Sequence, residues 1–134
     1  MSRYVVDTSF LLSFFNNKDF NHEKALEFMS TMYYEYLIIP SVVIAELASF
    51  TKNKQFRDLI LENVFNVASE VCSLNEGNIF EYLSFRESFS NSLKAMDSII
   101  LFTAIERDAE ILTFDKDMIR EYSRFRKKFP NISS

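Results

Sequence analysis

Short apolar segments of strand type alternate with longer segments of helical periodicity, and this alternation constrains the fold of the chain more than any other feature. Strands are predicted over residues 3–7, 37–39, 67–74 and 111–114. Helices are predicted over residues 10–16, 20–34, 42–52, 54–66, 76–88, 95–108 and 116–125, with a break at Asn91 and Ser92. Because strands separated by helices usually pair in parallel, the sequence predicts an α/β domain with a mainly parallel sheet.

The length and composition indicate one ordinary globular unit. We expect a single domain over residues 1–134, with a basic tail from about residue 126. Gly77 is the one glycine, which excludes phosphate-cradling loops that need several. The single cysteine, Cys72, excludes an internal disulfide. Without a signal sequence or a long apolar stretch, the chain is expected to be cytoplasmic.

Four carboxylates occupy positions where strand and helix patterns usually place other residues. Asp7 and Asp115 each follow an apolar run at the carboxyl end of a predicted strand, where α/β sheets bind ligands. Glu46 and Asp97 lie within the apolar stripes of predicted helices, although burying an unpaired charge is costly. The sequence therefore predicts that the four side chains meet at one end of the sheet.

Each acid also has a structural alternative. Asp7, Asp97 and Asp115 are suited to the start of a helix, and Glu46 to a buried ion pair. Taken together, however, clustered carboxylates repel one another by about 4 kcal/mol per pair at ~4 Å, so they bind protons or a cation. Because all four offer oxygen ligands, Mg²⁺ or Mn²⁺ is favoured. The net charge of −4 equals these four acids, so it does not exclude a phosphodiester substrate.

Four short motifs resemble those of the PIN-domain nucleases, and most of all the small VapC-type toxins of VapBC toxin–antitoxin systems. The similarity extends from residue 4 to about 118, with the acids in the family's order. The motifs are Val5-Val6-Asp7-Thr8-Ser9, Ile44-Ala45-Glu46-Leu47, Met96-Asp97-Ser98-Ile99-Ile100 and Leu112-Thr113-Phe114-Asp115-Lys116-Asp117. The resemblance implies a three-layer α/β/α fold, endoribonuclease activity, and an acidic pocket for Mg²⁺ or Mn²⁺.

The resemblance also implies a role for individual residues. The acids implied to be both metal-binding and catalytic are Asp7, Glu46, Asp97 and Asp115. The residues implied to support them are Thr8, Ser9, Thr113 and Asp117. Asp117 is an alternative fourth acid, but Asp115 is preferred because it lies nearer the strand end. Metal-assisted hydrolysis needs no side-chain nucleophile.

Other residues suggest partners. Possible RNA contacts are Lys94, Lys116, Arg124 and Arg126, although the last two also suit a solvated basic tail. The dense aromatic residues of segment 10–36 suit either a Phe-rich core or an interface. In the resembling family a homodimer and a cognate antitoxin are usual, so both are expected. His22 is expected to be exposed at a helix start.

Three rival functions remain open at this stage. A non-catalytic PIN-like module that binds RNA or protein would keep the fold without cleavage. A phosphoacceptor signalling domain would need adjacent acids after the first strand, whereas Thr8 and Ser9 follow Asp7. A structure-specific DNA nuclease shares the chemistry, but the chain is too short for an added DNA clamp.

Overall fold

A parallel sheet forms the centre of the protein. The computed structural model describes residues 2–32, 35–89 and 93–128. Its strands, all paired in parallel in the order β3-β2-β1-β4, are β1 (Arg3–Val6), β2 (Tyr36–Pro40), β3 (Glu70–Cys72) and β4 (Glu110–Leu112). The predicted α/β class with a parallel sheet is confirmed.

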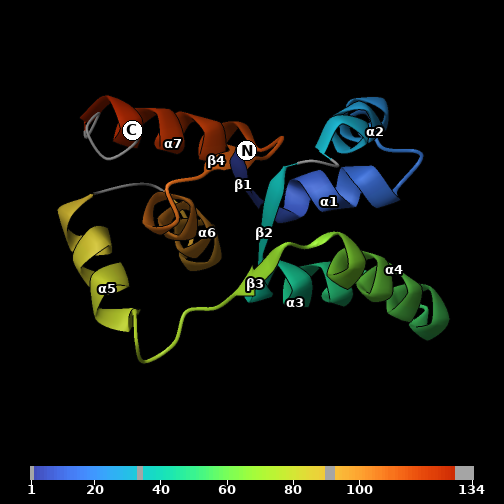
Figure 1. The fold of residues 1–134 in the computed structure, drawn as a ribbon, viewed down its shortest axis with the longest axis horizontal. Coiled ribbons are helices and arrows are strands. Elements are labelled where there is room, and N and C mark those ends of the chain that lie inside the picture. The colour runs from blue at the N-terminus through green and yellow to red at the C-terminus, as the bar shows by residue number, and fades with distance from the viewer. Residues whose placement is uncertain (1, 33–34, 90–92, 129–134) are drawn as a thin grey trace.

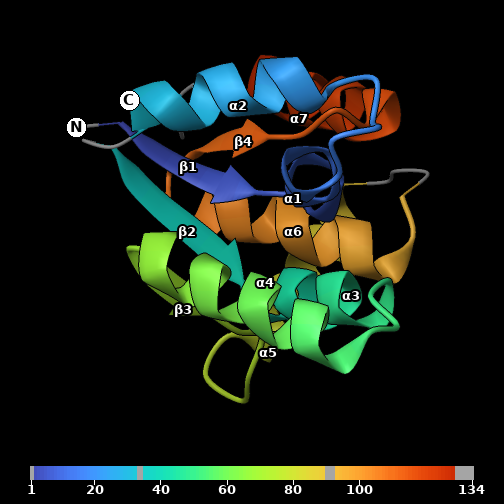
Figure 2. The same cartoon turned by 90° about the vertical axis from the view of Figure 1, so that its right-hand side faces the viewer.

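Helices cover both faces of this sheet. In Figure 1, α5, α6 and α7 lie to the left of the strands, and α1, α2 and α4 to the right. The view at 90° in Figure 2 shows α3 below the sheet, beside α4 and α6. The helices are α1 (Thr8–Phe15), α2 (His22–Thr31), α3 (Ser41–Ser49), α4 (Lys54–Val67), α5 (Ile79–Ser88), α6 (Ala95–Glu106) and α7 (Lys116–Lys128). The three-layer α/β/α arrangement is therefore confirmed.

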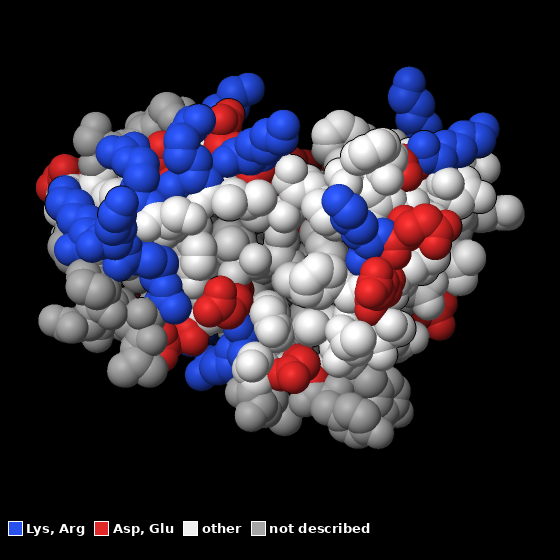
Figure 3. Space-filling model, turned by 90° about the horizontal axis from the view of Figure 1, so that it is seen from above, with Lys and Arg blue, Asp and Glu red and all other residues white. Residues whose placement is uncertain are grey.

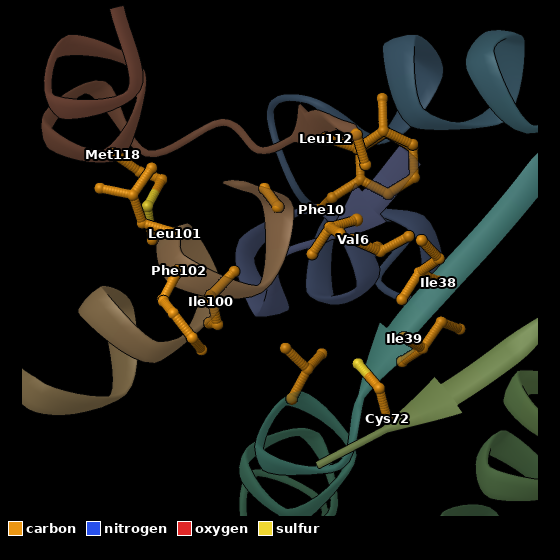
Figure 4. Close-up of a cluster of buried hydrophobic side chains, with 14 of the residues drawn as sticks. Val6, Phe10, Ile38, Ile39, Cys72, Ile100, Leu101, Phe102, Leu112 and Met118 are labelled. Carbon is orange, nitrogen blue, oxygen red and sulfur yellow. The ribbon is translucent and has the colours of Figure 1, made fainter. Parts of the chain in front are cut away.

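The core forms where the central strands meet α6. Val6 of β1 and Ile38 of β2 are fully buried because β1 and β2 are covered on both faces. Ile100 and Leu101 of α6 are also fully buried, and Figure 4 shows them beside the sheet residues. A helix that is apolar nearly all round has to be buried, and this position of α6 fixes Asp97 near the sheet.

Several element boundaries differ from the sequence prediction. The strand predicted over 67–74 is shorter because Val67 is the last residue of α4, and β3 is an edge strand on which Val71 is exposed. The helix predicted over 95–108 ends at Glu106, since Asp108 adopts a left-handed backbone with φ of 51°. The predicted break at Asn91 and Ser92 lies outside the described residues.

Helix boundaries also differ at turns and at the end of α7. The helix predicted over 76–88 begins only at Ile79, because Asn75 Oδ1 accepts a hydrogen bond from Gly77 N and holds a turn. The last helix continues to Lys128, three residues beyond the predicted end, so residues 126–128 form its final turn. Of the helices in the described ranges, none has the length and apolarity needed to cross a bilayer.

Core truncation is expected to test this packing. Replacing Ile38, which is fully buried in β2, by Ala should lower the free energy of unfolding by about 2–5 kcal/mol because it leaves a cavity. Urea denaturation followed by circular dichroism measures the change. The matched control is Leu59→Ala on α4, where the side chain is 54% exposed, and the expected change is within about 0.5 kcal/mol. Equal losses in both variants would contradict the described core.

Candidate acidic site

Pairing of β1 with β4 brings two distant segments together at the carboxyl end of the sheet. Val6 is in register with Leu112, and Asp7 N donates to the Leu112 carbonyl at 2.9 Å. The residues that follow each strand therefore lie side by side. Asp7 is the residue before α1 and is only 3% exposed, so its carboxylate is held inside the protein.

Two hydroxyl groups orient the buried carboxylate of Asp7. Thr113 Oγ1 donates to Asp7 Oδ2 at 2.6 Å, and Ser9 Oγ donates to the same oxygen at 2.8 Å. Ser9 Oγ also accepts from Phe114 N at 3.0 Å, which ties the start of α1 to the segment after β4. Hydrogen bonds to a carboxylate are stronger than neutral ones, so this network fixes the geometry of Asp7.

Asp115 lies in the same network and also starts α7. Its backbone N donates to Thr113 Oγ1 at 3.0 Å. Its Oδ1 accepts from Asp117 N at 2.9 Å and from Met118 N at 3.4 Å, which satisfies the first free N–H groups of the helix. The structural alternative for Asp115, a helix cap, is thus present, and Oδ2 has no hydrogen-bond partner among the described residues.

Two helices bring the other two acids to this end of the sheet. Asp97 lies in the first turn of α6, and Glu46 lies within α3. Both side chains are half-buried. Glu46 has no ion pair among the described residues, so the structure does not bear out a buried Arg or Lys partner for it. Phe50, the residue after α3, is 62% exposed.

The pKa of Asp97 shows that the other three carboxylates lie close enough to act on it. Burial first, and then the charges of Asp7, Asp115 and Glu46, raise the pKa of Asp97 from 3.8 to about 6, against a smaller opposing effect of Lys94. Acids that are far apart in the sequence therefore share one electrostatic environment. We refer to Asp7, Glu46, Asp97 and Asp115 as the acidic cluster.

The residues expected to support the cluster differ in what they contact. Ser9 and Thr113 both bind Asp7, as described above. Thr8 is buried, and its Oγ1 has no hydrogen-bond partner among the described residues. Asp117 is exposed and pairs with Arg120 at 3.1 Å, and its charge is not among those that raise the pKa of Asp97. Of these two acids, Asp115 is thus the one whose charge acts on Asp97.

The donor set of the cluster suits a hard divalent cation. It consists of carboxylate oxygens with nearby hydroxyl groups, and Mg²⁺ and Mn²⁺ prefer oxygen ligands. A cation would also lower the repulsion that raises the pKa of Asp97. Within residues 2–32, 35–89 and 93–128, no group of three or more His, Cys, Asp or Glu side chains is arranged to hold an ion as it stands.

The burial of two titratable residues, His22 and Glu121, was not predicted from the sequence. His22, expected to be exposed, is half-buried at the start of α2, and its Nδ1 lies 2.9 Å from the Ser13 carbonyl oxygen, away from the cluster network. Glu121, which the sequence analysis did not single out, is 1% exposed. Its position on the apolar face of α7, three residues after Met118 and four before Phe125, is the signal that marks it.

The fold and the site together define an α/β domain with carboxylates gathered at the carboxyl end of a parallel sheet. The family model described as PIN domain matches residues 4–124, so the chain belongs to the PIN-domain family. Its fold is similar to a chain in the crystal structure of VapBC2 from Rickettsia felis bound to a DNA fragment from their promoter. The TM-score is 0.68 at 22% identity, over 91% of this chain and 92% of that chain. Comparison with curated proteins gives no match.

The raised pKa of Asp97 predicts a pH dependence of stability. With a folded-state pKa of about 6 and an ordinary value of 3.8, Asp97 binds a proton more readily in the folded protein. The contribution of Asp97 to the free energy of unfolding should therefore increase as the pH falls from about 6 to about 4. Above about pH 6 the ionised group is destabilising, so Asp97→Asn should raise the free energy of unfolding there.

Urea denaturation in chelator, at several pH values across this window, measures the effect. Asp117→Asn is the control, because the exposed side chain of Asp117 contacts Arg120 rather than a carboxylate of the cluster. The same pH profile in the parent and in Asp97→Asn would contradict the electrostatic coupling of the four acids.

Proposed function

We propose that this chain is a metal-dependent endoribonuclease that hydrolyses RNA phosphodiesters. The observation that carries the proposal is the gathering of Asp7, Asp115 and Glu46 around Asp97, whose pKa is raised first by burial and then by these three charges. Membership of the PIN-domain family supports the same activity. A domain without a cation would gain nothing from holding like charges together, since each pair costs free energy.

The four acids are proposed to hold Mg²⁺ or Mn²⁺. When bound, such an ion polarises the scissile phosphate and makes water a better nucleophile. Asp7 is prepared for this role, because Ser9 and Thr113 occupy only its Oδ2. Its Oδ1 has no hydrogen-bond partner among the described residues. Two hydroxyl groups thus fix the orientation of the carboxylate while one oxygen stays available as a ligand.

Asp115 is proposed as the fourth acid for a similar reason. Its Oδ1 is used at the start of α7, and this bond orients the carboxylate relative to the strand end. Lys94, the residue before α6, lowers the pKa of Asp97, so its charge lies close to the cluster. We propose that it contacts a phosphate group of the bound RNA. No side-chain nucleophile is required, since the attacking group is water.

We further propose that the protein acts in the cytoplasm as the toxin of a toxin–antitoxin pair, as a homodimer. The similar chain from Rickettsia felis comes from a VapBC2 structure. A groove of about 330 Å³ between α1, α3 and α4 suits an apolar antitoxin segment; its lining includes Leu12, Phe15, Leu47, Phe50 and Phe56. Phe20, one of the aromatic residues of segment 10–36, is 93% exposed and suits an interface. Tyr33 and Tyr34 of that segment lie outside the described residues.

Removal of a cluster carboxylate is expected to abolish RNA cleavage. Asp7→Asn and Asp97→Asn should each lower kcat by at least about 100-fold, because each removes a proposed ligand. Gel-based cleavage of labelled RNA with Mn²⁺, and with chelator, measures the loss. The control is Asp117→Asn, an exposed acid next to the site, which should retain most of the activity. Parent-like activity of Asp7→Asn and Asp97→Asn would contradict the assignment.

Metal binding has a readout that does not depend on cleavage. Mn²⁺ should raise the Tm of the parent, because the ion binds the folded state and relieves carboxylate repulsion. Asp97→Asn should show a smaller rise in Tm at the same Mn²⁺ concentration. A rise in Tm without cleavage of any RNA would favour the alternative function, a non-catalytic PIN-like module that binds RNA or protein. No rise in Tm would contradict a metal site.

A further inference from the structure

The charges of the protein are unevenly divided between α7 and the rest of the chain. The 13 residues of α7 include six Lys and Arg and two acids, a formal charge of +4. Because the whole chain carries −4, the remaining residues carry −8. A helix of opposite charge to its own domain has a strong local potential, which attracts anions.

Most of these cations share one face of α7. Arg120, Arg124 and Lys128 follow Lys116 at intervals of four residues, and Lys127 lies between the last two on the same side. All five side chains are exposed, whereas Met118, Tyr122 and Phe125 on the opposite side are buried. Figure 3 shows the blue side chains gathered over α7 on the left of the molecule. We call this set the basic face: Lys116, Arg120, Arg124, Lys127 and Lys128.

A buried acid holds the middle of the basic face in place. Glu121 is 1% exposed, and both of its carboxylate oxygens lie 2.9 Å from Arg124 Nη1. Arg120 Nε lies 3.8 Å from the same carboxylate. Because the bonds of Arg124 to Glu121 use Nη1 alone, its Nε and Nη2 keep three N–H groups that are suited to phosphate oxygens. The Arg124 head group is thus positioned before any ligand binds.

Arg126 does not belong to the basic face. It comes two residues after Arg124 and so points from another side of the helix. There its guanidinium lies 3.7 Å from Glu110 Oε1 and 5.4 Å from the centre of the Tyr122 ring. Arg126 is therefore left out of the proposed RNA path, whereas Lys116 and Arg124 lie on the outward face. The same helix thus contains a cation that can serve as an internal control.

Stabilisation of the helix alone does not explain the basic face. Cations in the last turn interact favourably with the helix dipole, which accounts for Lys127 and Lys128. Lys116 is the first residue of α7, where the dipole disfavours a positive charge. Lys116 also follows Asp115 directly, so the basic face begins beside the acidic cluster. With a rise of 1.5 Å per residue, it extends about 18 Å from there.

We propose that the basic face of α7 binds the phosphate backbone of single-stranded RNA and leads the strand to the acidic cluster. This inference rests on the proposed ribonuclease function and adds the path of the substrate. A single row of cations along one helix matches one backbone, whereas duplex RNA requires contacts across successive grooves. The basic face therefore favours an unpaired strand.

The test is the salt dependence of RNA binding in chelator, where cleavage is absent. The parent and Lys116→Gln/Lys127→Gln are titrated against a fluorescein-labelled oligouridylate by anisotropy. These two lysines form no ion pair within the described residues, so the double variant leaves Glu121 and its arginines intact. Loss of two phosphate contacts should reduce the slope of log K against log salt by about 1.4, which weakens binding about 25-fold at ~0.1 M salt.

Two controls distinguish the loss of local phosphate contacts from the effect of a lower net charge. Lys24→Gln/Lys54→Gln, on α2 and α4, changes the net charge equally, and Arg126→Gln removes a cation from the opposite side of α7. Both should keep the parent slope. Parent-like binding by Lys116→Gln/Lys127→Gln, equal weakening by the α2/α4 control, or tighter binding of duplex RNA or an acidic peptide would overturn the proposal. Failure of the parent to cleave RNA with Mn²⁺ would instead overturn the proposed function, and the binding comparison would stand.

Discussion

The hydrogen bond from Thr113 to Asp7 is the contact on which the site depends. It joins residues 106 positions apart at 2.6 Å, and it exists because β1 and β4 pair in parallel with their carboxyl ends at the same edge. The Ser9 hydroxyl completes the link from the side of α1. Since Asp7 is buried, its charge is tolerated only with these donors or with a cation.

The position of α6 supplies the next constraint. Ile100, Leu101 and Ala104 are fully buried, so the helix has little freedom to rotate or slide without opening the core. Asp97, in its first turn, is consequently held half-buried beside the other acids, so that burial first and then their charges raise its pKa to about 6. Core packing and functional electrostatics are thus coupled: the apolar residues that stabilise the domain also keep the acids close enough to repel one another.

The acidic cluster and the basic face of α7, at the two ends of the proposed substrate path, have opposite charge. The acidic cluster repels a phosphate backbone unless a cation is bound, whereas the basic face of α7 attracts the backbone without a bound metal. Asp115 and Lys116 are adjacent in the sequence and mark the border between the two regions. Glu121, although acidic, serves the basic side, because it holds Arg124. In this arrangement, the proposed RNA binding and the proposed cleavage belong to two neighbouring surfaces.

The sequence by itself determined the α/β class, the order of helices and strands, and which four acids stand out from the strand and helix patterns. Strand and helix periodicity and the cost of a buried charge are local properties that need no partner. Tertiary structure alone decided the hydroxyl contacts of Asp7, the burial of Glu121 and the separation of Arg126 from the basic face. These features depend on strand pairing and on which side of α7 packs on the core. Single-sequence patterns do not specify such long-range contacts, even where, as at Glu121, they mark the residue.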